Sequence, residues 1–181
     1  MFIYPNKPIR VQTLDTFLSL ANDGLWVLQA KHDGDRALIE VDKDGVVTIY
    51  SRHNRVHADS APWRHIADLP LARPFLLDGE LVNKKLIIIW DYGVLAGKMV
   101  VSLPYAQRLQ RILTLPDLSS IHGYTIKTVS SAAAQRKSVE RLLSGGERVE
   151  GLVAKRLDAV DFWGISRTTE VPSMLKWRIK G

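Results

Sequence analysis

The sequence contains no cysteine. This absence excludes disulfides, thiolate metal sites and thiolate nucleophiles, and it fits a protein of the reducing cytosol. No apolar run approaches the roughly 20 residues that a membrane-spanning helix needs. The first ten residues, MFIYPNKPIR, lack the positively charged region followed by an apolar region that a secretory signal peptide has. Repeats, low-complexity tracts and linker-like stretches are missing as well. We therefore expect a single domain over residues 1–181 in the cytoplasm.

The composition is that of a globular protein, with 46% hydrophobic and 24% charged residues among 181. Positive charge is in excess, and the formal net charge is +6. Such a balance favours a polyanionic partner such as nucleic acid or a phosphate-rich ligand. Charge alone does not decide the matter, because many basic proteins bind neither.

Period-two apolar segments with β-branched residues and flanking turn signals dominate the chain and predict strands. These segments span residues 25–31, 36–41, 46–50, 75–82, 86–91, 124–129, 151–156 and 174–180. Helical faces are fewer: one over residues 14–21 closed by Gly24, one ending before Pro116, and one ending at Gly145. Strands in hairpin-like succession with interspersed helices predict an α+β fold with antiparallel sheets.

A lysine ends the first of these strands and is followed by a turn and an arginine. Gln29 and Lys31 point to the same face of that strand, and the chain continues as His-Asp-Gly-Asp-Arg up to Arg36. Taken alone, this segment could be a solvated hairpin. It nevertheless resembles Lys-x-Asp-Gly-x-Arg, the active-site motif of the covalent nucleotidyltransferases, which are the DNA ligases, RNA ligases and mRNA capping enzymes. By chance these four fixed residues recur in roughly one chain in a thousand of this length.

The resemblance implies that the Lys31 amine attacks the α-phosphate of a nucleoside triphosphate. A free lysine has a pKa of about 10.4, so only about one amine in a thousand is neutral near pH 7.4. Neighbouring positive charge and partial desolvation lower a lysine pKa. The same site should therefore contain further cations.

The last strand supplies those cations. Residues 173–180 alternate apolar and basic side chains, so we expect Ile179 in the core and the basic residues on the opposite face. The segment resembles the family's closing Lys-x-Lys motif, with an arginine in second place. The resemblance implies that Lys176 and Arg178 grip the α-phosphate. A basic edge strand that deters aggregation is the alternative.

Two further segments resemble family motifs on the nucleoside side. Asp78-Gly79-Glu80 is similar to the Asp-Gly-Glu motif, which implies that Arg36 and Glu80 hold the ribose and that Glu80 contacts a divalent metal. Trp90-Asp91 is similar to the aromatic-Asp motif, whose ring stacks on the purine. The alternatives are a bent strand with solvated carboxylates and a tryptophan that belongs to the core.

Two segments resemble the motifs that serve metal and nucleic acid. Residues 150–155 match Glu-Gly-apolar-apolar-x-Lys, the most ligase-like stretch, which implies that Glu150 is a metal-side acid. Glu150 and Lys155 have opposite strand parity, so both can face one site only if the strand kinks near Gly151. Tyr50 to Asn54 resembles the Ser-Arg motif that holds the nick phosphate, which makes Arg52, with Arg55, the expected nucleic-acid contacts. A solvated loop is the alternative.

Six motifs in the family's order, spread from residue 31 to residue 178, make the chain resemble the adenylation domain of an ATP-dependent DNA ligase. The resemblance implies two antiparallel sheets flanked by helices, ATP and Mg²⁺ as cofactors, and nicked duplex DNA or RNA as partner. Gln29 would accept a hydrogen bond from the adenine 6-amino group. The ligase pattern continues into an oligonucleotide-binding (OB) domain that does not follow within these 181 residues, so an OB domain from elsewhere is a further expected partner. The alternatives are an RNA ligase, a GTP-dependent capping guanylyltransferase, and a catalytically silent nucleic-acid-binding module. If the source is a bacterium or phage, we expect the protein at the nucleoid.

Overall fold

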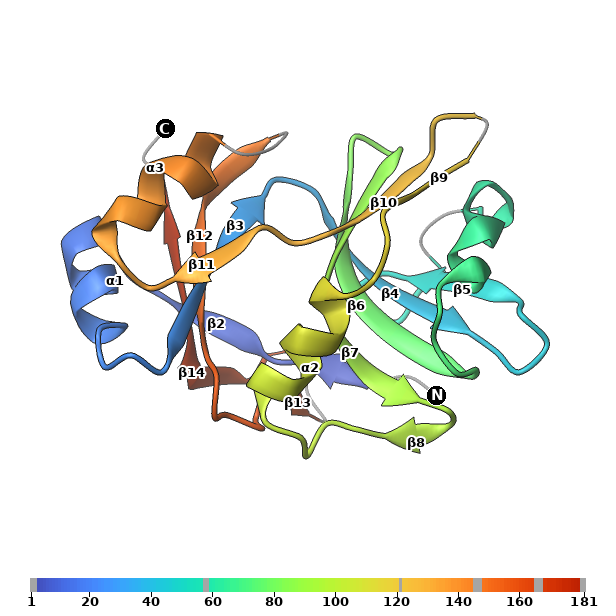
Figure 1. The fold of residues 1–181 in the computed structure, drawn as a ribbon, viewed down its shortest axis with the longest axis horizontal. Coiled ribbons are helices and arrows are strands. Elements are labelled where there is room, and N and C mark those ends of the chain that lie inside the picture. The colour runs from blue at the N-terminus through green and yellow to red at the C-terminus, as the bar shows by residue number, and fades with distance from the viewer. Residues whose placement is uncertain (1–2, 57–58, 121, 145–147, 165–167, 180–181) are drawn as a thin grey trace.

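The computed structural model describes residues 3–56, 59–120, 122–144, 148–164 and 168–179. In this part of the chain, strands form two large sheets and one small one, with helices on their outer sides (Figure 1). The strands are β1 (Tyr4–Pro5), β2 (Lys7–Arg10), β3 (Trp26–His32), β4 (Asp35–Val41), β5 (Val47–Tyr50), β6 (Phe75–Val82), β7 (Leu86–Leu95), β8 (Lys98–Met99), β9 (Leu118–Ser119), β10 (Thr125–Thr128), β11 (Ser131–Ala133), β12 (Val149–Arg156), β13 (Trp163–Gly164) and β14 (Glu170–Arg178). The helices are α1 (Leu14–Leu20), the 3-10 helix η1 (Ala61–Asp68), α2 (Tyr105–Leu113) and α3 (Arg136–Ser144). No helix of the described residues is long and apolar enough to cross a membrane.

The five-stranded sheet has the order β11-β3-β12-β14-β2, and helices α1 and α3 cover its outer face. Side chains alternate along β3, so Trp26, Leu28 and Ala30 are buried on one side of the strand. Trp26 and Leu28 pack there with Phe17 of α1 and Leu142 of α3. The other face of β3, which carries Gln29 and Lys31, is turned toward the second sheet.

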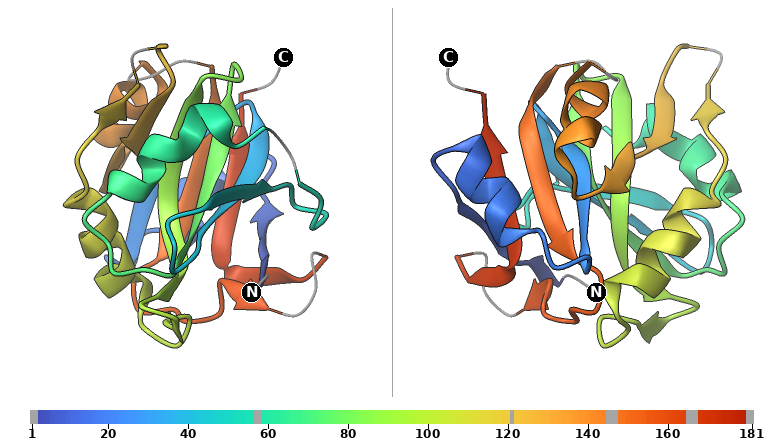
Figure 2. Two further views of the ribbon diagram at one scale, coloured as in Figure 1. Left: turned by 90° about the vertical axis from the view of Figure 1, so that its right-hand side faces the viewer. Right: turned by 60° about the vertical axis from the view of Figure 1, so that its left-hand side comes forward.

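The seven-stranded sheet has the order β5-β4-β6-β7-β10-β9, with β8 added beside β7. Helix η1 covers its outer face, where Trp63 and Ile66 join the largest apolar cluster (Figure 2, left). A third cluster, which includes Tyr105 and Leu109 of α2 and Met174 of β14, joins the two sheets. The inner faces of the sheets meet there, and a cavity lies beside this cluster, with Met174 in contact with both.

The predicted α+β class is confirmed, and each of the eight predicted strands and three predicted helices has a counterpart in the structure. Two strand pairs are parallel rather than antiparallel, β10 with β7 and β14 with β2. Parallel neighbours need long connections, and these pairs are indeed far apart in the chain. Helix α1 ends at Leu20, before Gly24, whereas Gly145 lies outside the described residues. Ile179 is 47% exposed, so its prediction as a core residue is wrong.

Two β-bulges lie at the inner edge of the cavity. Along β7 the pairing with β6 passes from Asp91 to Ile89, so Trp90 is an extra residue in the ladder. Along β12 the pairing with β3 passes from Val149 to Gly151, so Glu150 is also an extra residue. A bulge breaks the strict alternation of a strand and turns a side chain to a new direction. The kink that the sequence requires near Gly151 is therefore present.

Candidate active site

A cavity of about 560 Å³ lies between the inner faces of the two sheets. This volume is in the range that binds small molecules and cofactors. Strands β2, β3, β12 and β14 contribute from one sheet and β4, β6 and β7 from the other, with the loop after β5 at the entrance. The predicted site residues that line it are Gln29, Lys31, Arg36, Arg52, Glu80, Trp90, Glu150, Lys176 and Arg178. The fold therefore brings together every predicted site residue except Arg55.

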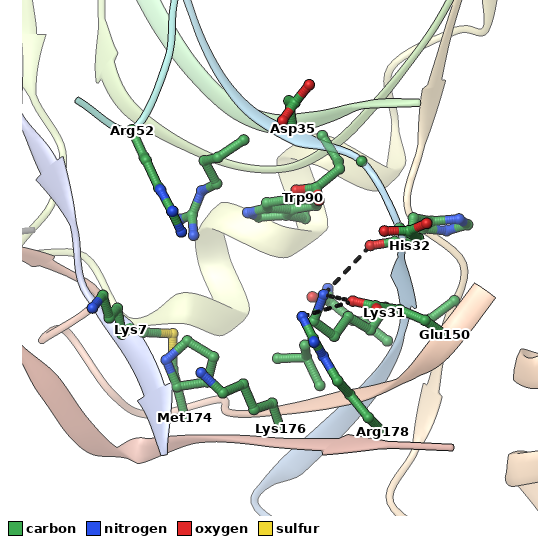
Figure 3. Close-up of a pocket in the computed structure, with 18 of the residues that line it drawn as sticks. Lys7, Lys31, His32, Asp35, Arg52, Trp90, Glu150, Met174, Lys176 and Arg178 are labelled. Atoms are coloured by element: carbon green, nitrogen blue, oxygen red, sulfur yellow. Dashed lines mark hydrogen bonds and ion pairs between the residues drawn. The ribbon is translucent and has the colours of Figure 1, made fainter. Parts of the chain in front are cut away.

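Lys31 is held at the base of this cavity by an ion pair. Its Nζ contacts Glu150 Oε1 and also donates a hydrogen bond of 3.4 Å to the carbonyl of His32. Arg178 reaches the same carboxylate oxygen at 3.1 Å (Figure 3). The Lys31 side chain is 18% exposed, so its amine is sheltered yet open to the cavity. Glu150 thus pairs with one cation from each of two strands, Lys31 of β3 and Arg178 of β14.

Further cations lie along the β14 side of the cavity. Lys176 and Arg178 are two residues apart on that strand, so both point to the cavity. Lys7 of β2 projects beside them (Figure 3). Burial lowers the pKa of Lys176, the positive charges of Arg178, Lys31 and Lys7 lower it further, and Glu170 opposes them. This group of cations suits a ligand with several phosphate charges.

Trp90 and Arg36 are positioned by a single carboxylate, that of Asp78. Arg36 Nε donates to Asp78 Oδ1 at 2.6 Å, and its NH2 group contacts Oδ2. Trp90 Nε1 donates to the same Oδ2 at 2.8 Å. The guanidinium of Arg36 lies 5.2 Å from the centroid of the Trp90 ring, within the range of a cation–π contact. Asp78 is 2% exposed, so its role is to orient these two side chains.

Glu80 lies beside Arg36, its partner across the β4–β6 pair. The alternative of a solvated carboxylate is wrong for Glu80, which is only 9% exposed. Burial raises the pKa of Glu80 to about 7, against the opposing charges of Arg36 and Lys31 and with the repulsion of Asp78 and Glu150. A buried carboxylate with a pKa near neutrality is typical of functional sites.

The floor of the cavity contains a buried polar cluster. Gln29, 2% exposed, donates from Nε2 to the hydroxyl of Tyr105 at 2.7 Å. Lys155 donates to the same hydroxyl at 3.3 Å, and the hydroxyl donates to the carbonyl of Trp90 at 2.8 Å. Burial lowers the pKa of Lys155 to about 8, with the charges of Asp91 and Asp78 opposing the shift.

Of the two predicted nucleic-acid contacts, Arg52 and Arg55, only Arg52 lines the cavity. A tight turn over residues 51–55 carries Asn54 at a φ of 57° and presents Arg52 and His53 to the entrance of the cavity. Arg52 donates from Nε to His53 Nε2 at 3.1 Å. Arg55 is exposed in the same turn but does not line the cavity. Arg52 is therefore the residue of the pair that can meet a ligand bound inside.

Two residues of the cavity lining or floor, Tyr105 and Lys7, have no signal in the sequence that predicts their place, and the orientation of Lys155 was left open. Tyr105 is the first residue of helix α2, and no local pattern marks its side chain as part of the site. Lys7 lies on a short proline-containing strand, β2, that has no strand signal of its own. Lys155 is part of the Glu-Gly motif, and it lines the cavity together with Glu150 because the bulge at Glu150 offsets the strand parity.

Comparison with known proteins finds no matching family model and no matching curated protein. Solved structures do match. Mycobacterial DNA ligase D complexed with ATP and MES has a TM-score of 0.70 at 19% identity, over 97% of this chain and 60% of that chain. The ligase domain of M. tuberculosis LigD has a TM-score of 0.67 at 19% identity, over 95% of this chain and 58% of that chain. A structure from work on Lig E DNA ligases has a TM-score of 0.59 at 16% identity, over 99% and 70%.

These matches establish the fold. The chain has the α+β fold of DNA ligase catalytic domains, as the sequence motifs predicted. It spans about three-fifths of the length of the ligase D chains that it matches.

Proposed function

We propose that this chain is the nucleotidyltransferase domain of an ATP-dependent DNA ligase, with Lys31 as the residue that becomes covalently linked to AMP. The observation that carries the proposal is the cavity itself. It joins the sheltered Lys31 amine, further cations that include Lys176 and Arg178, several carboxylates and an aromatic ring in one cleft of nucleotide size. This set matches what transfer of a nucleotide to an amine requires.

In the proposed complex, adenine stacks on Trp90, and Met174 lies across the cavity from that ring (Figure 3). Gln29 accepts a hydrogen bond from the 6-amino group. Arg36 and Glu80 hold the ribose, which their adjacent positions on β4 and β6 support. Lys176 and Arg178 then face the phosphates.

The chemical step forms a bond between Lys31 Nζ and the α-phosphorus and breaks the bond from that phosphorus to the β-bridging oxygen. Pyrophosphate leaves with the bonding electron pair, and the amine loses a proton. Glu150 Oε1 already contacts Nζ, so it is the atom positioned to take that proton. Lys176 and Arg178 stabilise the charge that develops on the phosphate.

The cofactor proposed with ATP is Mg²⁺. No group of three or more His, Cys, Asp or Glu side chains that could hold a metal gathers among the described residues. Mg²⁺ is commonly bound by one or two carboxylates together with substrate phosphates, which fits Glu80 and Glu150 on the wall of the cavity. When bound, the ion would neutralise triphosphate charge and assist departure of pyrophosphate.

The second half of the proposed reaction passes AMP from Lys31 to the 5′-phosphate of a nick. Arg52 at the entrance is the proposed contact for that phosphate, and Arg55 a contact for the neighbouring backbone. Nicked duplex DNA is the proposed partner, and an OB domain is the proposed second partner. The matching Lig E structure comes from work on DNA binding with a minimal scaffold, and this supports DNA as the partner.

Incubation with α-labelled ATP and Mg²⁺, followed by mass spectrometry, tests the proposal. We expect an acid-labile AMP adduct on Lys31 alone, absent in Lys31→Ala and present in Lys127→Ala, which changes an exposed lysine of β10. An adduct on another lysine, or none in the folded protein, would refute the central claim.

The same assay separates the alternatives. Labelling by GTP in preference to ATP would indicate a capping guanylyltransferase. Sealing of nicked RNA rather than nicked DNA would indicate an RNA ligase. Binding of nucleic acid without any covalent nucleotide would indicate a silent binding module.

A further inference from the structure

Lys155 is a buried cation that the proposed reaction does not use. The residue is 6% exposed, and its Nζ lies 4.6 Å from the ring centroid of Tyr105, 5.6 Å from that of Trp90 and 5.8 Å from that of Phe162. No carboxylate of the described residues forms a salt bridge with it. An ammonium group buried without such a partner lowers stability unless other contacts compensate for the lost hydration. Within the described part of the chain, only the neutral hydroxyl of Tyr105 accepts a hydrogen bond from it.

The Tyr105 hydroxyl determines how its neighbours are oriented. It has one hydrogen, and it donates that hydrogen to the carbonyl of Trp90 at 2.8 Å. The group of Gln29 that faces the hydroxyl at 2.7 Å must therefore be the amide nitrogen, because an amide oxygen there would oppose the lone pairs of the hydroxyl. The amide oxygen of Gln29 is consequently left on the side away from Tyr105.

The cavity floor thus offers an acceptor and a donor beside the Trp90 ring. The acceptor is Gln29 Oε1 and the donor is the ammonium of Lys155, and both residues line the cavity. Adenine has the complementary arrangement, because its 6-amino donor is flanked by the acceptor nitrogens N1 and N7. Guanine has an acceptor oxygen at position 6, which would face the acceptor of Gln29 when the ring is held in the same place.

We propose that Lys155 reads the base: its ammonium donates a hydrogen bond to N1 or N7 of adenine, while the Tyr105 hydroxyl holds both Lys155 and Gln29 in position. The inference rests on the proposed function and adds to it a second base-selecting residue and the residue that orients the pair. Because burial lowers the pKa of Lys155 only to about 8, the group is still mostly an ammonium at neutral pH and can donate.

Equilibrium binding of AMP, 1-deaza-AMP and 7-deaza-AMP to the whole chain tests this proposal. AMP has the base and the α-phosphate but no leaving group, so binding is measured without covalent transfer. We expect one of the two deaza nucleotides to bind wild type about 10- to 100-fold more weakly than AMP, the range for a hydrogen bond to a charged group. Lys155→Met should bind AMP more weakly than wild type by the same factor. It should no longer distinguish AMP from that analogue.

Lys98→Met is the matched control, because Lys98 is exposed on β8 and does not line the cavity. It should bind all three nucleotides as wild type does. Lys155→Met should also melt at or above the wild-type temperature, because the change removes a buried charge. A variant that loses affinity equally for all three nucleotides, or that distinguishes them as wild type does, would overturn the proposal.

Tyr105→Phe gives an independent measurement, because it keeps the ring that packs against Phe162 at 4.8 Å and removes only the hydroxyl. We expect its preference for AMP over GMP to fall about 10-fold or more. A variant that keeps the full preference would refute the positioning role of Tyr105. If wild type binds AMP and labels Lys31 but these variants behave like wild type, only this inference fails. If wild type neither binds AMP nor forms the adduct, the proposed function fails with it.

Discussion

Replacement of Glu80 by glutamine should stabilise the protein and at the same time impair it as an enzyme. Glu80 is 9% exposed, and burial raises its pKa from 4.5 to about 7. Glutamine keeps the size and shape of the side chain and cannot ionise. The expected gain in stability therefore comes from removing a charge that the folded protein holds at a cost.

The sign and size of the effect follow from linkage. Below pH 4.5 the carboxyl is protonated in the folded and unfolded chains alike, so its titration favours neither state. Between pH 4.5 and about 7 the unfolded chain releases the proton while the folded chain keeps it, so the free energy of unfolding falls as the pH rises. Above that window the loss is complete, and at about 1.4 kcal/mol per pH unit it amounts to roughly 3 kcal/mol. Glu80→Gln does not suffer this loss.

Urea unfolding near pH 4.5 and near pH 8 measures the difference. Relative to wild type, the Glu80→Gln variant should gain about 3 kcal/mol between the two conditions. Glu140→Gln, which removes an exposed carboxylate from α3, should gain far less. A Glu80→Gln advantage that is the same at both pH values, or a variant that is less stable near pH 8, would refute the raised pKa of Glu80.

Four shorter predictions concern other residues of the site. Lys31→Arg should form no AMP adduct in the labelling assay although it keeps the charge, because a guanidinium does not deprotonate; any adduct would contradict Lys31 as the nucleophile. Lys176→Ala should slow single-turnover adenylation by about 10-fold or more, yet leave the free energy of unfolding within about 0.5 kcal/mol, and an unfolded variant would instead point to a structural role. Arg52→Ala should slow sealing of a pre-adenylated nick more than it slows Lys31 adenylation, and equal losses would place Arg52 at the nucleotide. Near pH 7, Lys155→Met should be more stable than wild type by roughly 3 kcal/mol. That gap should close as the pH rises from about 8, where the folded chain loses the Lys155 proton, toward 10.5, where the unfolded chain does too. A constant gap in urea unfolding would contradict the lowered pKa.

Most of the site could be predicted because its motifs sit on strands, where side chains alternate. This alternation puts Gln29 beside Lys31, and Lys176 beside Arg178, on the face opposite the apolar residues. The order of the motifs along the chain predicted the fold, since it favoured one fold among the α+β possibilities. Alternation does not hold for Ile179, because the strand ends at Arg178 and the residue after it is exposed.

The sequence by itself determined the strands, the face on which Lys31 lies and the cations that share that face, because these depend on a period of two residues within single segments. Only the tertiary structure decided that Trp90 and Glu150 are bulge residues, because a bulge is defined against a partner strand. Only the tertiary structure brought Tyr105 to Gln29 and Lys155, and buried Glu80 deeply enough to raise its pKa to about 7. Contacts and burial of this kind arise between segments far apart in the chain, where no local pattern records them.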